Sequence, residues 1–221
     1  MRKYVWFSVM FFLALPLVRA QRPVQYDYKL WIGIGGGVNA ETVSFKPKVQ
    51  QETYIAPMGS FLLRWDVERH CSLQVEANYS IQGWREQFDK PGKKYARELR
   101  YVEFPLLTHL YIEKKKARFF LNLGPKIGYL LSEKEKEKEG EFNDFELRRH
   151  ELTVENKLEW GLVGGVGINY AVNRRLGVEL EGRFSYNFND LYSTRRADLF
   201  GQASEMFGTV RINLLFLLYK Q

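Results

Sequence analysis

The sequence contains very little cysteine or histidine, and it has no long apolar segment after its first twenty residues. The single cysteine, Cys71, excludes an internal disulfide framework and a zinc site built from several cysteines. The three histidines, at positions 70, 109 and 150, are too few and too scattered for a histidine metal cage. Without several apolar runs of about 20 residues, the chain cannot form a bundle of transmembrane helices. Its 45% of hydrophobic residues excludes a disordered chain.

The first twenty residues have the pattern of a targeting segment. Arg2 and Lys3 precede an almost wholly apolar stretch, and Val18-Arg19-Ala20 fits a small-x-small cleavage site. We therefore expect residues 1–20 to be a cleaved secretory signal peptide, with an uncleaved membrane helix as the alternative. Residues 21–28 are then a short periplasmic N-terminal segment. Cleavage removes three basic residues and no acid, so the net charge falls from +7 to +4 (30 basic against 26 acidic), which predicts no nucleic-acid partner.

The rest of the chain shows an alternation of apolar and polar residues with a period of two. In 176–188 the even positions are apolar or glycine, and the odd positions are charged, polar or glycine. A helix would mix these two sets on one face, whereas a strand separates them. The same pattern predicts eight strands, at 29–39, 55–67, 72–84, 98–112, 117–131, 160–170, 176–188 and 206–218. Each is long enough to cross a bilayer at a tilt, which takes about 9–11 residues.

The connections between these strands alternate in length. Three are tight turns, and four are long loops at 40–54, 86–96, 132–156 and 189–204. An up-and-down barrel places all its long loops at one end, as transmembrane barrels of bacterial outer membranes do. We therefore predict an all-β fold for residues 29–221: an eight-stranded antiparallel up-and-down transmembrane β-barrel.

Alternation alone does not say which face is outside, because a soluble barrel could turn its apolar face inward. Three features favour a membrane barrel: apolar faces almost without charge, aromatic residues near the strand ends, and polar faces that combine charges with glycine. The interior is then predicted to hold a network of ten charged residues: Lys29, Arg64, Glu76, Arg100, Glu103, Lys126, Glu179, Glu181, Arg183 and Arg211. Paired charges would fill the lumen as a structural plug; a polar path for a small solute is the alternative.

Four segments of the sequence are similar to a known family. Tyr101-Val102-Glu103-Phe104-Pro105-Leu106-Leu107 and the glycine-rich stretch from Gly124 to Leu131, which includes Gly128, resemble segments of the PorT-like outer-membrane β-barrel family of Bacteroidetes. The stretches 160–167 and 180–186 are similar to later strands of that family, so the resemblance spans most of the mature chain. It implies an eight-stranded barrel located in the cell outer membrane. Because the founding member takes part in type IX secretion, it also implies an accessory role in secretion or envelope assembly.

Catalytic and cofactor motifs find little support in the sequence. Gly33-Ile34-Gly35-Gly36-Gly37-Val38 lacks the last glycine and the following helix of a dinucleotide-binding loop, so we expect no cofactor. An outer-membrane lipid-modifying enzyme would need a serine beside a histidine, and only guesswork pairs His150 with one. We expect a non-enzymatic barrel with a structural or interaction role. A narrow channel or transporter is the alternative, and a lipid-modifying enzyme is a remote one.

The segment 132–141 reads SEKEKEKEGE, a charge pattern typical of a solvated segment. An extended hairpin that turns near Gly140 would pair these charges with Arg148, Arg149 and Glu151, and would place Phe142 and Phe145 at its tip. We expect the loops 132–156 and 189–204 to contact an envelope protein partner. The other expected partners are outer-membrane lipid and lipopolysaccharide, and the barrel is expected to be a monomer.

Overall fold

A computed structural model of the chain describes residues 28–46, 49–88, 92–192 and 202–220. The expected signal peptide at 1–20 and nearly all of the segment 21–28 lie outside the described residues. The strands are β1 (Lys29–Lys46), β2 (Gln51–Glu52), β3 (Tyr54–Glu68), β4 (Cys71–Glu86), β5 (Lys94–Lys114), β6 (Ala117–Glu139), β7 (Leu158–Ala171), β8 (Leu176–Asp190) and β9 (Gln202–Lys220). One short helix, α2 (Asp144–His150), lies between β6 and β7.

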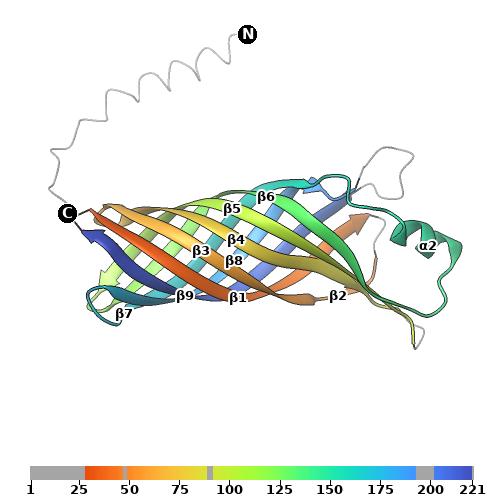
Figure 1. Cartoon of the computed structure of the whole chain (residues 1–221), viewed down its shortest axis with the longest axis horizontal. Coiled ribbons are helices and arrows are strands. Elements are labelled where there is room, and N and C mark those ends of the chain that lie inside the picture. The colour runs from red at the N-terminus through yellow and green to blue at the C-terminus, as the bar shows by residue number, and fades with distance from the viewer. Residues whose placement is uncertain (1–27, 47–48, 89–91, 193–201, 221) are drawn as a thin grey trace, which may run out of the picture.

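Eight of these strands form a closed ring. Each pairs antiparallel with its sequence neighbours, β4 also pairs with β5, and β1 closes the ring against β9. The two-residue strand β2 is an addition at the end of β4. Figure 1 shows the ring from the side, with the C-terminus at one end and α2 at the other. The predicted eight-stranded antiparallel barrel is thus confirmed.

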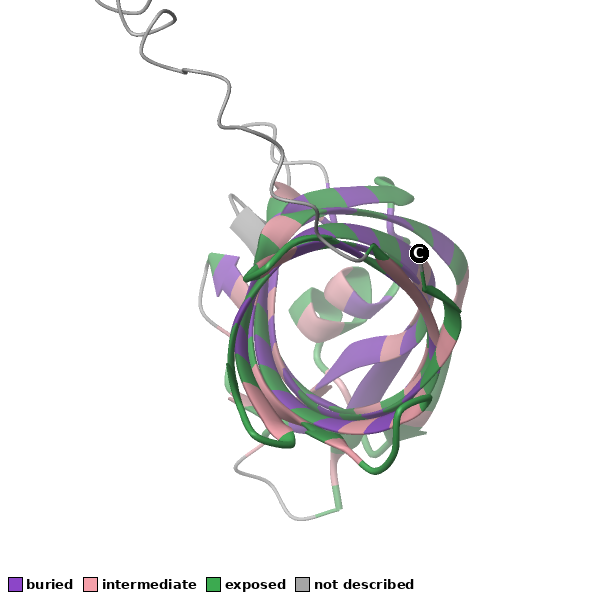
Figure 2. Cartoon of the chain, turned by 90° about the vertical axis from the view of Figure 1, so that its left-hand side faces the viewer, coloured by how far each residue is buried: buried purple, intermediate pink, exposed green. Residues whose placement is uncertain are grey.

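The alternation of the sequence becomes an alternation between lipid-facing and interior positions. In β8, Glu179, Glu181 and Arg183 are buried, whereas Leu180 and Phe184 are about half exposed. Figure 2 shows the same change of buried and exposed residues along the strands, seen down the barrel axis. Because side chains of a strand point to opposite faces in turn, one sequence builds an apolar outer surface and a polar interior.

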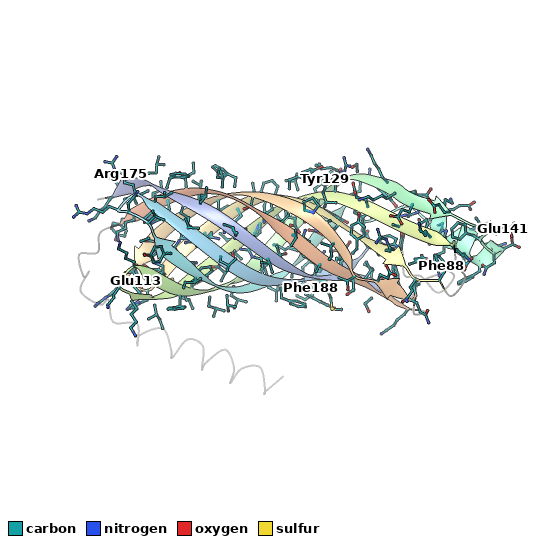
Figure 3. The ribbon with its side chains drawn as sticks, turned by 90° about the horizontal axis from the view of Figure 1, so that it is seen from below. Phe88, Glu113, Tyr129, Glu141, Arg175 and Phe188 are labelled. Atoms are coloured by element: carbon teal, nitrogen blue, oxygen red, sulfur yellow. The ribbon has the colours of Figure 1, made fainter. Side chains whose placement is uncertain are left out.

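Exposed aromatic side chains flank the apolar outer surface. Tyr28 and Trp65 lie near the end with the short turns, and Trp160 contacts Phe188 further along the barrel, with ring centroids 4.9 Å apart. Tyr129 and Phe188 lie well before the end of the molecule that carries Glu141 (Figure 3). The strand β6 continues from 130 to 139 beyond Tyr129, which is about 33 Å of chain at 3.3 Å per residue. The barrel therefore extends well beyond its second aromatic band.

Much of the chain expected to form long loops is strand instead. β1 continues to Lys46, and the charged segment 133–139 belongs to β6, where it pairs with residues of β5 between Lys94 and Leu99. The expected pairing with Arg148 and Arg149 is wrong, because these residues lie in α2. A capping box between Asn143 and Glu146 begins that helix. Gly140, with a φ of 94°, ends β6 as a turn residue.

Within the described residues, no helix is both long enough and apolar enough to cross a membrane.

Candidate functional site

The centre of the lumen holds a cyclic ion-pair network, which we call the central quartet: Glu76, Glu181, Arg183 and Arg211. Arg183 lies 2.8 Å from Glu76 and 3.0 Å from Glu181, and Arg211 lies 2.7 Å from each of the two carboxylates. The four side chains come from β4, β8 and β9 and are almost completely buried. Two acids and two bases neutralise each other, as buried charges require.

A second ion pair lies next to the central quartet. The Arg64 Nη2 donates to Glu179 Oε2 at 2.8 Å, and its Nε donates to Gln74 Oε1 at 2.5 Å. Glu179 also accepts a hydrogen bond of 3.0 Å from the Asn213 amide. Both partners of the ion pair are at most 1% exposed, so this layer also fills the cross-section of the barrel.

A third group of charges has more acids than bases. Lys126 Nζ lies 2.5 Å from Glu103 and 3.1 Å from Glu159. Asn187 donates to both Glu159 and Glu205, at 2.7 and 2.9 Å. Glu41 accepts a hydrogen bond of 2.6 Å from the Gly83 N–H.

Eight of the ten predicted network residues lie together inside the barrel: Arg64, Glu76, Glu103, Lys126, Glu179, Glu181, Arg183 and Arg211. Lys29 lies at the mouth with the short turns, where it lines a cavity together with Arg64. The prediction for Arg100 is wrong. This residue occupies an outward position of β5 beside Val102, with 35% of its side chain exposed, and pairs with Glu98 at 2.8 Å. Strand parity places it outside, because its neighbours Leu99 and Tyr101 face inward.

Sequence reasoning missed Asp66, which is buried within a predicted strand, and three interior acids at strand ends, Glu41, Glu159 and Glu205. Each of these three lies one or two residues outside a predicted strand, because the predicted strands end where the apolar residues of the outer face end. The structure continues the strands past the apolar region, so the interior parity simply carries on. Extending the alternation by two residues at each strand end finds all three. His109 faces the interior, and its Nδ1 lies 2.7 Å from Asn122 Oδ1, a partner that the sequence does not indicate.

The family-motif residues lie on the two paired strands β5 and β6, where they shape the ladder and the lumen. Pro105 lies opposite Lys126, and a gap in the pairing follows, where Pro125 of β6 interrupts the hydrogen bonds. A Cβ on Gly124 would lie 2.0 Å from the Leu106 carbonyl oxygen, and one on Gly128 would lie 2.4 Å from Glu159 Oε1. These glycines thus allow a close backbone approach and leave room for an interior carboxylate. Tyr101 and Glu103, the other two motif positions, are both buried in the lumen.

An apolar layer closes the barrel on the side of the long loops. Its members, which come from four strands and from the segments around 154 and 191, are Val43, Phe45, Trp84, Leu99, Tyr101, Leu130, Val154, Leu191 and Tyr192. Phe45 and Tyr192 both contact Trp84, with centroid distances of 5.5 and 6.4 Å. The cavity that touches Glu103, Lys126 and Arg183 has about 10 Å³, which is room for about one water molecule at most.

Arg97 of β5 fixes the segment after α2 to the barrel. Its guanidinium pairs with Glu133 at 2.6 Å and donates to the carbonyls of His150 and Leu152. It also donates to the Tyr192 hydroxyl at 3.1 Å and lies over the Trp84 ring. Nothing in the sequence indicates this role, because only folding brings the partners together.

The helix α2 packs against the barrel through its inward face. His150 stacks on Tyr95 with ring centroids 3.5 Å apart, and Arg149 forms an ion pair with Glu86. Glu146 pairs with Lys93 and accepts the Asn143 backbone N–H. Burial raises the pKa of Glu146, but these two hydrogen bonds stabilise the carboxylate and bring its pKa below the ordinary value.

The chemistry that the interior can perform is limited by its packing. Within the described residues, no group of three His, Cys, Asp or Glu side chains is arranged to hold a metal ion. Gly35 and Gly37, from the rejected dinucleotide motif, lie in β1, where a Cβ would meet Asn213 and the Val210 carbonyl of β9. Cys71 is a free, half-buried thiol at the start of β4.

Solved structures with a similar fold include several outer-membrane barrels of low sequence identity. They include Ail, the attachment invasion locus protein of Yersinia pestis (8% identity, 84% of this chain and 98% of that one, TM-score 0.41), and Neisserial surface protein A (6%, 82% and 95%, 0.45). The outer membrane enzyme PagL is another (11%, 82% and 97%, 0.43). At these identities, none of them indicates what this chain does.

The sequence itself matches a family model over most of its length. No functionally curated protein matches the chain. The model that does match is the outer membrane protein beta-barrel domain, over residues 20–193. An outer-membrane location agrees with the apolar outer surface of the barrel and its aromatic bands. In such barrels the short turns face the periplasm and the long loops face the outside of the cell. The chain therefore belongs to the outer membrane protein beta-barrel domain family and is a protein of the outer membrane.

Proposed function

We propose that this protein is a non-enzymatic, non-conducting barrel that anchors an extracellular docking platform for an envelope protein partner. The observation that supports it best is the filled lumen. From the short turns to the long loops, the Arg64–Glu179 pair, the central quartet and the apolar layer follow one another along the axis. A narrow channel would need a continuous wet path, whereas a barrel of eight strands has an interior that side chains fill.

The platform is the part of the molecule beyond the second aromatic band. It consists of the outer halves of β5 and β6 and of α2, which lies at the far end from the termini (Figure 1). β5 is paired on both sides from Tyr95 to Leu110, and its ladder with β6 continues to Lys94 and Glu139, where β6 is paired with β5 alone. A paired β-ladder is a stiff support, so the platform holds its surface at a fixed position outside the membrane.

The outward face of α2 has the composition of an interaction surface. Asp144, Phe145, Leu147 and Arg148 are exposed. Leu147 and Arg148 follow Asp144 by three and four positions, and Arg148 follows Phe145 by three, so the four share one broad face of the helix. Phe145 is 52% exposed, although an aromatic side chain without a partner would gain from burial. Aromatic and arginine side chains are enriched in protein–protein interfaces, which favours a protein partner here.

Lipid contacts complete the proposed environment. Lys134, Lys136 and Lys138 are exposed along β6 and share one parity of the strand, beyond Tyr129. At that height an outer-leaflet lipopolysaccharide would present phosphates to these ammonium groups. Because β1 pairs with β9 and closes the ring, the apolar part of the barrel has no unpaired strand edge that could join a second copy, and we also propose a monomer.

The resemblance to PorT-like barrels of Bacteroidetes supports a secretion or assembly accessory as the specific role. A lipid-modifying enzyme would instead need a nucleophile next to a histidine. Among the described residues, the three histidines hydrogen-bond to the Tyr111 carbonyl, to Asn122 and to Glu86, and none of them to a serine. These contacts favour the non-enzymatic role.

Site-specific photocrosslinking in the native envelope tests the platform. A photoreactive phenylalanine analogue at Phe145 is expected to give a discrete protein adduct. The matched control is the same analogue at Phe119, which is exposed to a similar degree on the lipid-facing surface of β6. An adduct at neither position, or the same adduct at both, would contradict docking through α2. Steady single-channel currents of the purified protein in planar bilayers would contradict the non-conducting lumen.

A further inference from the structure

The mouth of the barrel with the short turns contains a cavity of about 510 Å³, which we call the periplasmic vestibule. Its walls come from the starts or ends of β1, β5, β6, β7, β8 and β9, from β3, and from the two turns around 115 and 174. Figure 3 shows Glu113 and Arg175 at this end, opposite Glu141. A volume of this size suits a small organic ligand, because ligand pockets commonly have about 300–1,000 Å³.

The lining of the vestibule is strongly basic. Eight basic side chains line it, with Glu113 as the one acid among the described lining residues: Lys29, Arg64, Lys115, Lys116, Arg118, Arg174, Arg175 and Lys220. These basic residues come from separate parts of the chain, so only folding gathers positive charge at this mouth of the barrel. Low-dielectric walls around charges of one sign raise the local concentration of oppositely charged ligands.

Several of these cations have no acidic partner among the described residues. Arg64 is satisfied by Glu179, and Arg118 by Glu113 and Asp66. In contrast, Lys115, Lys116, Arg174 and Arg175 form no ion pair within the part of the chain that the structure describes. Repulsion among like charges costs free energy that an anion in the vestibule would relieve.

The remaining wall is apolar and fixed. Leu215 is buried, and Trp31 is held by a hydrogen bond of 3.2 Å from its indole N–H to Asp66. Together with Leu176 and Leu217 these side chains give the vestibule an apolar side beneath its basic rim. An inorganic ion would contact only the basic rim, whereas an organic anion would contact both the basic rim and the apolar side of the vestibule.

We propose that the periplasmic vestibule binds a soluble, phosphorylated small molecule of the periplasm. Phosphate is the anion that several converging guanidinium and ammonium groups recognise best, because it offers oxygens in several directions. The vestibule opens on the axis of the barrel, and its lining residues Arg64, Gly177 and Leu215 face the interior. A lipid head group lies on the other side of the strands, so the geometry favours a ligand that comes from the aqueous periplasm.

Titration calorimetry of the full barrel in a non-ionic detergent tests this site, with tripolyphosphate as the probe. We expect saturable binding with one equivalent per chain, weakened by about tenfold or more in R174S/R175S. The matched control is K94S/K157S, which removes two exposed charges on the side of the long loops and is expected to bind like the parent. The heat-dependent shift of the folded band on gels shows that each variant is folded.

Three results would overturn the proposal. Absence of saturable binding would exclude a phosphate site. Equal weakening in the two variants would show attraction by net charge only. Binding of short-chain phosphatidylglycerol without binding of tripolyphosphate would assign the phosphate chemistry to a lipid instead of a soluble ligand. A failure of photocrosslinking at α2 would leave this test unaffected, because the two sites lie at opposite ends of the barrel.

Discussion

Replacing Glu76 with Gln removes one negative charge from the central quartet while keeping the shape of the side chain. Glu76 accepts hydrogen bonds from Arg183 at 2.8 and 2.9 Å and from Arg211 at 2.7 and 3.0 Å. After the substitution, two buried guanidinium groups share Glu181 alone, and one positive charge remains uncompensated. Breaking a buried ion pair from one side costs about 3–5 kcal/mol, so we expect a loss of that size in the free energy of unfolding.

A second substitution separates the charge imbalance from the loss of a contact. E76Q/R183Q leaves Arg211 paired with Glu181 at 2.7 Å, so the interior is neutral again. We expect the double variant to be destabilised by clearly less than the sum of the two single variants, because residues in one ion-pair network are coupled by about 0.5–3 kcal/mol. The surface control is Glu139→Gln, whose pair with Lys94 is largely exposed and is worth at most about 1 kcal/mol.

Urea unfolding in lipid vesicles, followed by tryptophan fluorescence and by the gel shift of the folded barrel, measures these differences. With a slope of about 1–3 kcal/mol per molar urea, a loss of about 3 kcal/mol lowers the midpoint by roughly 1–3 M. If E76Q unfolds at the same urea concentration as E139Q, the interior charges are solvated instead of paired, and the filled-lumen argument fails. Full additivity of E76Q and R183Q would refute the coupling within the central quartet.

Three further outcomes follow from the structure. Gly124→Ala should destabilise the barrel by about 1–3 kcal/mol, because a Cβ would lie 2.0 Å from the Leu106 carbonyl oxygen, whereas Gly182→Ala, with nothing within 4 Å, should be close to neutral in the same urea assay. The pKa of Glu146 is depressed in the folded protein, so its carboxylate stabilises the docking of α2 fully above the ordinary carboxyl pKa of about 4.3. This stabilisation is lost as the pH falls toward the folded pKa. Hydrogen exchange of α2 should therefore rise below about pH 4 in the parent and stay constant in E146Q. Arg97→Gln should make the segment after α2 sensitive to an added protease without changing the stability of the barrel by more than about 1–2 kcal/mol, and unchanged protection would argue against Arg97 as its anchor.

The alternation of apolar and polar residues determined the fold class by itself. Each strand buries or exposes side chains with a period of two, so the number of strands, the antiparallel up-and-down order and the parity of most interior residues follow from local sequence. The local pattern alone thus places Glu179, Glu181 and Arg183 in the interior, where they are buried. Arg100 marks the limit of this inference: its charge suggests an interior position, but its parity within β5 turns it outward, where an exposed guanidinium needs no buried partner.

Tertiary structure alone decided which charges meet and where the strands end. Glu76 and Arg211 are 135 positions apart, and only the shear between strands brings them to the same height. The strands continue beyond the apolar outer face because backbone pairing persists wherever water or an interior partner satisfies the side chains. For the same reason the vestibule has no signature in the sequence: its cations are contributed by turns and strand ends that are ordinary surface positions until the ring closes.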